Sequence, residues 1–219
     1  MVTWTETWRA WRAGASLGDL AVLKFAWLAG PTDARSARLG AVGDGCLEVD
    51  MEALRALPAG TVGRAYARHL DENGLQPLQI SPEIKRRFAA DPYPLWYTTT
   101  HDLLHTLTGF PTTPAGEIGL FAFMIGQGFG SRGRGRLWRS LASYTLFMPL
   151  HAPGVWHNAR VGLAMAKRAR NLLEQPLGSF FARPLAEVRA ELGLPDPRTV
   201  DIAPGRPSLL ARWLMPKAA

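Results

Sequence analysis

The sequence predicts an all-α fold: a single helical domain followed by a Pro-rich C-terminal tail. Apolar residues recur at three- and four-residue spacing, and no segment shows the sustained alternation of a half-buried strand. Of the 219 residues, 47% are hydrophobic and 20% charged, which suits one domain with a sizeable core. We expect a peripheral amphipathic helix over residues 1–16, the helical domain over 17–194 and the tail over 195–219.

The formal net charge of +7 favours anionic partners. No nucleic-acid-binding signature accompanies the charge, so we expect no nucleic acid partner. The single cysteine, Cys46, excludes an internal disulfide and a Cys-rich zinc pattern. No apolar run reaches the roughly 18 to 20 residues needed to span a bilayer. The acids Glu6 and Asp19 do not fit the basic segment and the following apolar segment of a signal peptide. We therefore expect a soluble or peripheral protein, and the lack of a targeting peptide favours a bacterial, cytoplasmic location.

The first helix places Trp4, Trp8 and Trp11 on one face, with Arg9 and Arg12 beside them. Tryptophans next to arginines are typical of a membrane interface. Aromatic helix faces are also commonly buried in a core. Both interpretations stay open for this face.

Helix start and stop signals define four further segments before residue 91. A helix over 17–28 ends at Gly30-Pro31, and a short one over 50–57 begins after an acid and stops at "PAG". A helix over residues 61–74 ends near Asn73-Gly74. Residues 81–90 begin with a Ser cap and Pro at the first helical position, and "DPYP" ends that helix.

Two central helices follow. The first covers 95–109 and ends at Gly109, a natural C-cap. After the loop "FPTTP", Thr113 caps a helix whose first residue is Pro114. That helix, "PAGEIGLFAFMIGQG", is apolar nearly all round, which predicts burial. Phe121, Phe123 and Met124 could fill the core or line an apolar groove.

The last third contains a segment rich in Arg and Gly. Residues 131–140, with four arginines from Arg132 to Arg139, are expected to form a loop because of their glycines. It could dock on anionic lipid, contact a partner enzyme or simply be solvated. Long helical patterns then cover 137–150 and 155–174, and a short helix covers 184–195. The tail carries one apolar cluster, "LLARWLM" (209–215).

Residues 101–117, "HDLLHTLTGFPTTPAGE", hold the candidate site. His101 and His105 share one helix face, the spacing at which two imidazoles bind one metal ion. Asp102 can bind the ion directly or accept a hydrogen bond from a ligating histidine. Glu117 returns to the same place if the next helix packs antiparallel. Such a mixed N/O set suits Zn²⁺, Fe²⁺, Mn²⁺ or Co²⁺.

Each of these residues also has an ordinary interpretation. A His pair at this spacing can be accidental, and Asp102 could pair with a basic neighbour. Glu117 in a first helical turn favours the helix dipole without any metal. Thr98, Thr99 and Thr100 could hold a metal-bound water or bond back to their own helix.

The full pattern, His101-Asp102-x-x-His105 followed after eleven residues by Glu117, resembles the signature of the coenzyme Q biosynthesis protein 4 family. The surroundings "HTLTGFPTTPAGEIGLFAFM", "LPAGTVGRAYARHLDENGLQP" and "PLAEVRAELGL" resemble other segments of that family. The similarity spans roughly Asp19 to Leu194. One departure is "GSFFARP", where many members carry a Trp-Glu pair; any site role for that acid is not expected here.

The resemblance implies a helical fold and a divalent metal, zinc first, held by His101, Asp102, His105 and Glu117. It implies the metal-dependent, oxidative C1-decarboxylation of a polyprenylated 4-hydroxybenzoate intermediate in ubiquinone biosynthesis. These four residues would then be catalytic as well. Expected partners are the polyprenylated substrate or a prenyl lipid, other ubiquinone biosynthesis proteins, the inner membrane as a peripheral contact, and a second copy in a homo-oligomer.

Two other functions remain open. The first is a non-catalytic scaffold that binds prenyl lipid and organises ubiquinone enzymes at the membrane, with a structural metal. The second is a metal-dependent phosphohydrolase, suggested by the His-Asp pair alone. That class needs further ligands, and His69, His151 and His157 lack the spacing for it.

Overall fold

The computed structural model describes residues 2–30, 33–40, 45–129 and 133–206, and these ranges contain helices and no strand. The expected all-α class is therefore confirmed. The α-helices are α1 (Trp4–Arg12), α2 (Leu17–Ala29), α3 (Asp33–Gly40), α4 (Met51–Ala56), α5 (Val62–Asn73), α6 (Pro82–Arg87), α7 (Tyr93–Thr108), α8 (Pro114–Gly126), α9 (Gly133–Phe147), α10 (Ala152–Ala166) and α11 (Leu185–Leu192), and the 3₁₀ turns are η1 (Leu172–Glu174), η2 (Leu177–Phe180) and η3 (Pro197–Thr199).

Side-chain caps and a C-terminal glycine mark the ends of several helices. The Thr61 side chain accepts from Arg64 N at the start of α5, and Gly74 closes that helix in the left-handed conformation. Ser81 caps α6, although α6 ends at Arg87 and not at residue 90. Helix α7 begins at Tyr93, two residues before the predicted start, because proline is tolerated in a first turn.

The prediction of a loop over 131–140 is wrong from Gly133 onward, where α9 begins. Packing overrides the low helix propensity of glycine here, because Leu137 and Leu141 are buried in a cluster with residues of α8 and α10. Arg132 and the apolar cluster at 209–215 lie outside the described residues. The sequence pattern also missed α3.

The second long helix ends at Ala166 and not at residue 174. The Gln127 side chain explains part of this difference, because it donates to Arg170 O at 2.7 Å and accepts from Leu172 N at 3.1 Å. These bonds replace the helical partners of the chain after α10. The segment then forms the 3₁₀ turn η1.

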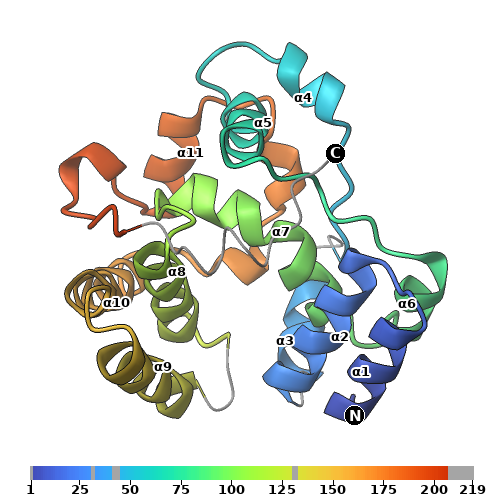
Figure 1. Cartoon of the computed structure of the whole chain (residues 1–219). Coiled ribbons are helices and arrows are strands. Elements are labelled where there is room, and N and C mark those ends of the chain that lie inside the picture. The colour runs from blue at the N-terminus through green and yellow to red at the C-terminus, as the bar shows by residue number, and fades with distance from the viewer. Residues whose placement is uncertain (1, 31–32, 41–44, 130–132, 207–219) are drawn as a thin grey trace.

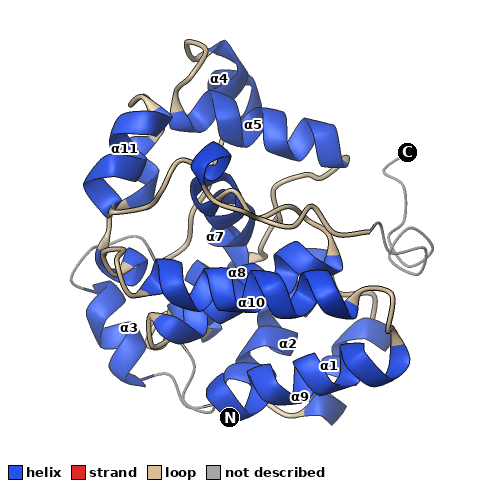
Figure 2. Cartoon of the chain, turned by 90° about the vertical axis from the view of Figure 1, so that its left-hand side faces the viewer, coloured by secondary structure: helices blue, strands red, loops and turns tan. Residues whose placement is uncertain are grey.

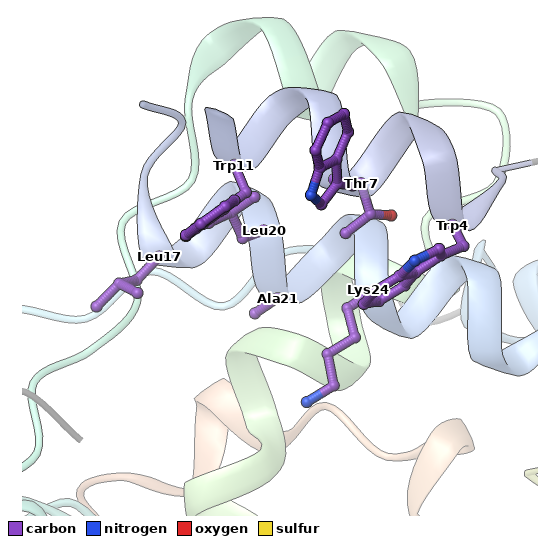
Figure 3. Close-up of a pocket in the computed structure, with 8 residues that line it drawn as sticks. Trp4, Thr7, Trp11, Leu17, Leu20, Ala21 and Lys24 are labelled. Atoms are coloured by element: carbon purple, nitrogen blue, oxygen red, sulfur yellow. The ribbon is translucent and has the colours of Figure 1, made fainter. Parts of the chain in front are cut away.

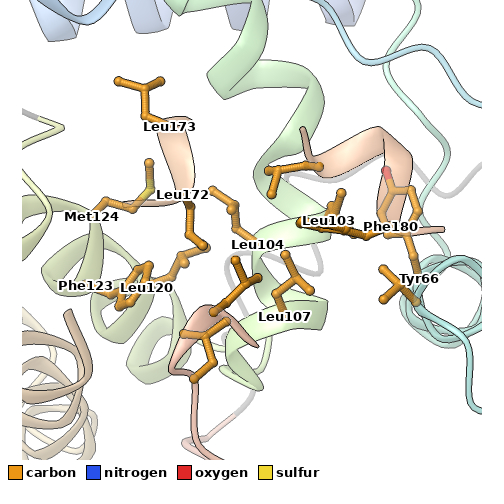
Figure 4. Close-up of a cluster of buried hydrophobic side chains, with 14 of the residues drawn as sticks. Tyr66, Leu103, Leu104, Leu107, Leu120, Phe123, Met124, Leu172, Leu173 and Phe180 are labelled. Atoms are coloured by element: carbon orange, nitrogen blue, oxygen red, sulfur yellow. The ribbon is translucent and has the colours of Figure 1, made fainter. Parts of the chain in front are cut away.

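Helix α7 runs through the middle of the molecule, between α5 and α8 (Figure 1). Its fully buried Leu103, Leu104 and Leu107 belong to the main core cluster. Phe123 and Met124 of α8 are in the same cluster, so these two residues fill the core and do not line a groove (Figure 4). Phe121 packs at the edge of the smaller cluster between α8, α9 and α10.

Helices α8 and α10 lie next to each other (Figure 1), and their backbones approach closely at Gly162. A Cβ atom on Gly162 would lie 2.1 Å from Gly119 O and 2.9 Å from Phe123 N. Only glycine allows this approach, which fixes the depth at which α8 sits in the domain.

Residues 197–205, which we call the closing segment, lie against the turn between α7 and α8. The buried Asn158 side chain accepts from Ala203 N at 2.8 Å and donates to Ala203 O at 2.9 Å. The Thr113 hydroxyl donates to Pro204 O at 2.8 Å. At the other end, Pro197 packs so closely on Gly109 that a Cβ there would lie 2.3 Å from its ring.

The tryptophans of α1 do not pack on the core. Trp4, Trp8 and Trp11 are all exposed, so the interpretation of this face as buried is wrong. Within the described ranges, none of the helices has the length and apolar character required to cross a membrane.

Candidate metal centre

The candidate site lies where the C-terminal half of α7 meets the first turn of α8. Gly109 ends α7 in the left-handed conformation (φ 81°), and the Thr113 side chain caps α8 by accepting from Gly116 N. The turn is tight, because a Cβ on Gly116 would lie 1.8 Å from Pro111 O. This turn brings the start of α8 back beside the end of α7 and places Glu117 next to the histidines.

Three of the four expected ligands come together. One nitrogen each from His101 and His105 and one oxygen from Glu117 lie within 4.8 Å of one another. The His105 Nε2–Glu117 Oε1 distance is 3.3 Å, and the His101 Nε2–Glu117 Oε2 distance is 3.5 Å. Asp102 is not part of this group; its Oδ1 lies 3.2 Å from Nδ1 of His101, on the other side of that ring. The geometry thus matches the second of the two roles left open for Asp102.

His105 is held in the orientation that a ligand needs. Its Nδ1 lies 2.8 Å from Phe110 O, and because a carbonyl only accepts, Nδ1 carries the proton. Its Nε2 is buried and has no hydrogen-bond partner, although Glu117 lies close by. Metal-ligating histidines characteristically donate their other ring N–H to a carbonyl or a carboxylate. The unpartnered Nε2 therefore fits a metal ligand.

Without a metal, the imidazoles of the site form ion pairs with the carboxylates of Asp102 and Glu117. Burial alone would lower the pKa of His101, but contacts with Asp102 and Glu117 outweigh it and raise this pKa to about 9. Burial would conversely raise the pKa of Glu117, yet the two imidazoles hold it far below its usual range. Burial would also raise the pKa of Asp102, but its hydrogen bond to His101 and the charges of the neighbouring imidazoles together lower it. The site thus carries ionised carboxylates, which attract a cation.

Sequence reasoning set His69 aside, but the structure places it beside the site. Its ring, on α5, stacks on that of His105 with centroids 5.8 Å apart and planes at 15°. Its Nε2 is buried without a hydrogen-bond partner. Burial and the neighbouring His105 lower the pKa of His69. The available signal was its position three residues after Tyr66, on the buried face of α5.

Other residues around the site have simpler roles. The Thr99 and Thr100 hydroxyls donate to Leu95 O and Trp96 O of their own helix, at 2.9 and 2.6 Å. These two residues therefore follow the ordinary interpretation. The ring of Tyr97 meets His101 edge-on with centroids 5.6 Å apart, and burial raises the pKa of the Tyr97 hydroxyl.

Two imidazole nitrogens and a carboxylate can hold one divalent ion with positions left open, the composition of a catalytic site more than of a closed structural one. The residue types suit zinc, iron, manganese or cobalt. Residues His101, His105 and Glu117 form the centre of this cluster, with Asp102 behind His101.

Comparison with known proteins gives a consistent family match. The family model described as "Coenzyme Q (ubiquinone) biosynthesis protein Coq4" matches residues 46–197. Mouse ubiquinone biosynthesis protein COQ4 homolog, mitochondrial, is 32% identical over 163 residues, covering 68% of this chain and 56% of that protein. The Xenopus laevis and human homologs are 38% and 40% identical, over 37% and 32% of this chain and 33% and 27% of theirs.

The aligned region thus spans about half the length of the mouse relative and less of the others. Among solved structures, a Nostoc punctiforme protein with a provisional assignment to ubiquinone biosynthesis superposes with a TM-score of 0.59. It is 20% identical and covers 88% of this chain and 89% of its own. This likeness supports the helical fold.

Proposed function

The chain belongs to the coenzyme Q (ubiquinone) biosynthesis protein Coq4 family, and on that basis we propose that it is a metal-dependent enzyme of ubiquinone biosynthesis. The reaction is the oxidative C1-decarboxylation of a polyprenylated 4-hydroxybenzoate intermediate. The observation that carries this proposal is the buried, unpartnered Nε2 of His105, 3.3 Å from the Glu117 carboxylate.

His101, His105 and Glu117 hold the divalent ion in this proposal, and zinc is the first candidate by family membership. Asp102 accepts the Nδ1–H of His101 and so leaves Nε2 of that ring free for the ion. The Phe110 carbonyl does the same for His105. Asp102 becomes a fourth ligand only if its carboxylate rotates away from His101.

The reaction replaces the C1 carboxyl group by a hydroxyl group. With water as the oxygen source, the substrate loses CO₂, two electrons and two protons, so a two-electron oxidant such as O₂ must accept the electrons. When bound, the ion acts as a Lewis acid toward the substrate oxygens. The chain's own contribution is to orient the two imidazoles and to keep Glu117 ionised beside them.

The test is metal content by elemental mass spectrometry, measured beside turnover of a substrate with a ¹³C-labelled carboxyl group. We expect near-stoichiometric metal in the wild type and in His157→Ala, a matched histidine control outside the site. We expect loss of both metal and ¹³CO₂ release in His105→Ala and Glu117→Ala. A wild type that takes up no metal after repletion, or that releases ¹³CO₂ equally well in the site variants, would refute the proposal.

A second candidate function is a non-catalytic scaffold that binds prenyl lipid and organises other ubiquinone enzymes at a membrane. The exposed tryptophans of α1 favour it, because a catalytic domain needs no such surface. In that case the ion is structural. A metal-loaded protein that releases no ¹³CO₂ under any oxidant would select this function.

Family membership also motivates the rest of the proposal. The polyprenyl chain of the substrate resides in lipid, so the protein works in peripheral contact with the bacterial inner membrane from the cytoplasmic side. The protein assembles with other ubiquinone biosynthesis proteins and with a second copy of itself. Co-purification with membranes and with those enzymes from cells tests this arrangement.

A further inference from the structure

Helix α1 presents three large aromatic side chains to solvent. Trp4, Trp8 and Trp11 are 55%, 44% and 63% exposed, although each could contribute far more to stability if buried. The exposed Leu17 and Trp27 of α2 continue the same apolar surface. An apolar surface of this kind on a folded domain marks an interaction site more often than a packing defect.

The tryptophans line a groove between α1 and α2 of about 440 Å³ (Figure 3). Trp4 supports the end of this groove, since its ring packs against that of Trp27 with centroids 5.3 Å apart. The Lys24 side chain runs along the open side of the groove. The groove is lined by Trp4, Thr7, Trp8, Trp11, Leu17, Leu20, Ala21 and Lys24.

The charges around the groove are cationic. Arg9, Arg12 and Lys24 are exposed, and the Arg12 guanidinium lies 5.0 Å above the Trp8 ring. The two acids of α1 and α2 are engaged elsewhere. Glu6 pairs with Arg87 at 2.7 Å, and Asp19 is buried and accepts from Ser81 N at 2.8 Å. The surface therefore combines tryptophan with uncompensated positive charge.

A second exposed apolar ridge lies on α9 and the turn into α10. Trp138, Leu146, Phe147 and Leu150 are 62% to 77% exposed, and Arg139 beside Trp138 is exposed as well. Helices α1 and α9 lie at the same end of the molecule in both views (Figures 1 and 2). We call the five exposed apolar side chains of α1 and α2 the basal face: Trp4, Trp8, Trp11, Leu17 and Trp27.

We propose that the basal face docks on an anionic lipid bilayer. This inference rests on the membrane contact of the proposed function. It adds which face of the protein binds the membrane and which headgroup charge that face prefers. Tryptophan is favoured at the boundary between acyl chains and headgroups, and arginine and lysine next to it attract anionic headgroups. A second copy of this chain would instead bring like charges together. A bilayer satisfies both the apolar and the cationic part of the surface.

The test is flotation of the metal-loaded protein with vesicles of phosphatidylcholine, with and without phosphatidylglycerol. We expect binding only to the anionic vesicles. Arg9→Gln with Arg12→Gln weakens binding about thirtyfold, since each cation near an anionic surface contributes roughly a fivefold factor. Arg55→Gln with Arg68→Gln removes the same charge from α4 and α5, at the opposite end of the molecule, and leaves binding unchanged.

The apolar part is tested with Trp4→Ser, Trp8→Ser and Trp11→Ser combined, which abolishes flotation while metal content stays at the wild-type level. If the triple variant does not fold, Trp11→Ser alone and quenching of wild-type tryptophan fluorescence by brominated lipid replace it. Equal binding of the α1 variants and the α4–α5 control would overturn the proposal. The proposal would also be overturned if the wild type did not bind vesicles but formed a dimer, and the triple variant were monomeric. Neither result bears on the proposed metal centre.

Discussion

The Nδ1 atom of His105 lies 2.8 Å from the carbonyl oxygen of Phe110, five residues later in the chain. This contact places a proton on Nδ1 of the buried imidazole and turns Nε2 toward Glu117, whose Oε1 lies 3.3 Å away. We expect ¹⁵N NMR of the metal-free protein to show His105 protonated at Nδ1. Addition of Zn²⁺ should shift the Nε2 resonance and leave Nδ1 protonated. A ring that carries no proton on Nδ1 before metal addition contradicts this geometry.

Metal binding should release a proton at neutral pH. The pKa of His101 is about 9 in the metal-free site, so this imidazole is protonated at pH 7 and must lose a proton to bind an ion. We expect about one proton per ion, measured by calorimetry in buffers of different ionisation enthalpy. Asp102→Asn removes one of the two anionic partners of His101 and should reduce the proton release. Equal heats in all buffers would argue against His101 as a ligand.

The stability of the metal-free protein should fall on both sides of a neutral window. The raised pKa of His101 contributes stability that is complete below pH 6.5 and is lost as pH rises through about 9. The lowered pKa values of Glu117 and Asp102 contribute stability that is present above about pH 4.5 and is lost on acidification. Thermal melting across this range checks the prediction. Glu117→Gln should flatten the alkaline decline, and an equally steep decline in that variant would contradict it.

Two glycines should respond to alanine in opposite directions. A Cβ at Gly162 meets the backbone of α8 at 2.1 Å, so Gly162→Ala should destabilise the fold by about 1–3 kcal/mol or more. Gly135 lies in α9 with open space around it, so Gly135→Ala should stabilise by about 0.5–1 kcal/mol. Urea unfolding of both variants measures the two free energies. A destabilising Gly135→Ala would mean that residues 133–140 are not helical in solution.

The closing segment should depend on one buried amide. Asn158→Ala removes both hydrogen bonds to Ala203 and leaves the backbone N–H and C=O of that residue without these partners, at a cost of about 1–3 kcal/mol. Urea unfolding measures the loss. Asn73→Ala is the matched control, because the Asn73 side chain bonds exposed partners. Equal losses in both variants would show that the buried contacts of Asn158 contribute no more to the free energy of unfolding than the exposed contacts of Asn73.

Local signals predicted the helices whose ends are marked by side-chain caps. Ser81 and Thr113 cap as expected, because a cap depends only on a few neighbouring residues. The start of α9 could not be predicted from local signals. Its Gly-rich first turn is helical because Leu137 and Leu141 pack on distant helices. The end of α10 likewise depends on Gln127, more than forty residues away from its partners.

The candidate site likewise contains residues that local signals predict and residues that only tertiary contacts place. The spacing of His101 and His105 on one helix and the glycine- and proline-rich turn before Glu117 were sufficient to bring these three residues together in the prediction. His69 reaches His105 only across the contact between α5 and α7. No spacing along the chain encodes that contact. The same holds for the Phe110 carbonyl, whose direction follows from the turn after Gly109.

The closing segment has a consequence for the order in which the protein matures. Pro197 rests on Gly109, and Pro204 accepts from Thr113, so both ends of the turn that joins the two ligand-bearing helices are completed by residues near the end of the described chain. Chains fold as they emerge from the ribosome, N-terminal parts first. The ligand-bearing helices of the nascent protein therefore emerge before the residues that complete the turn between them, and metal loading is favoured once residues 197–205 have left the ribosome.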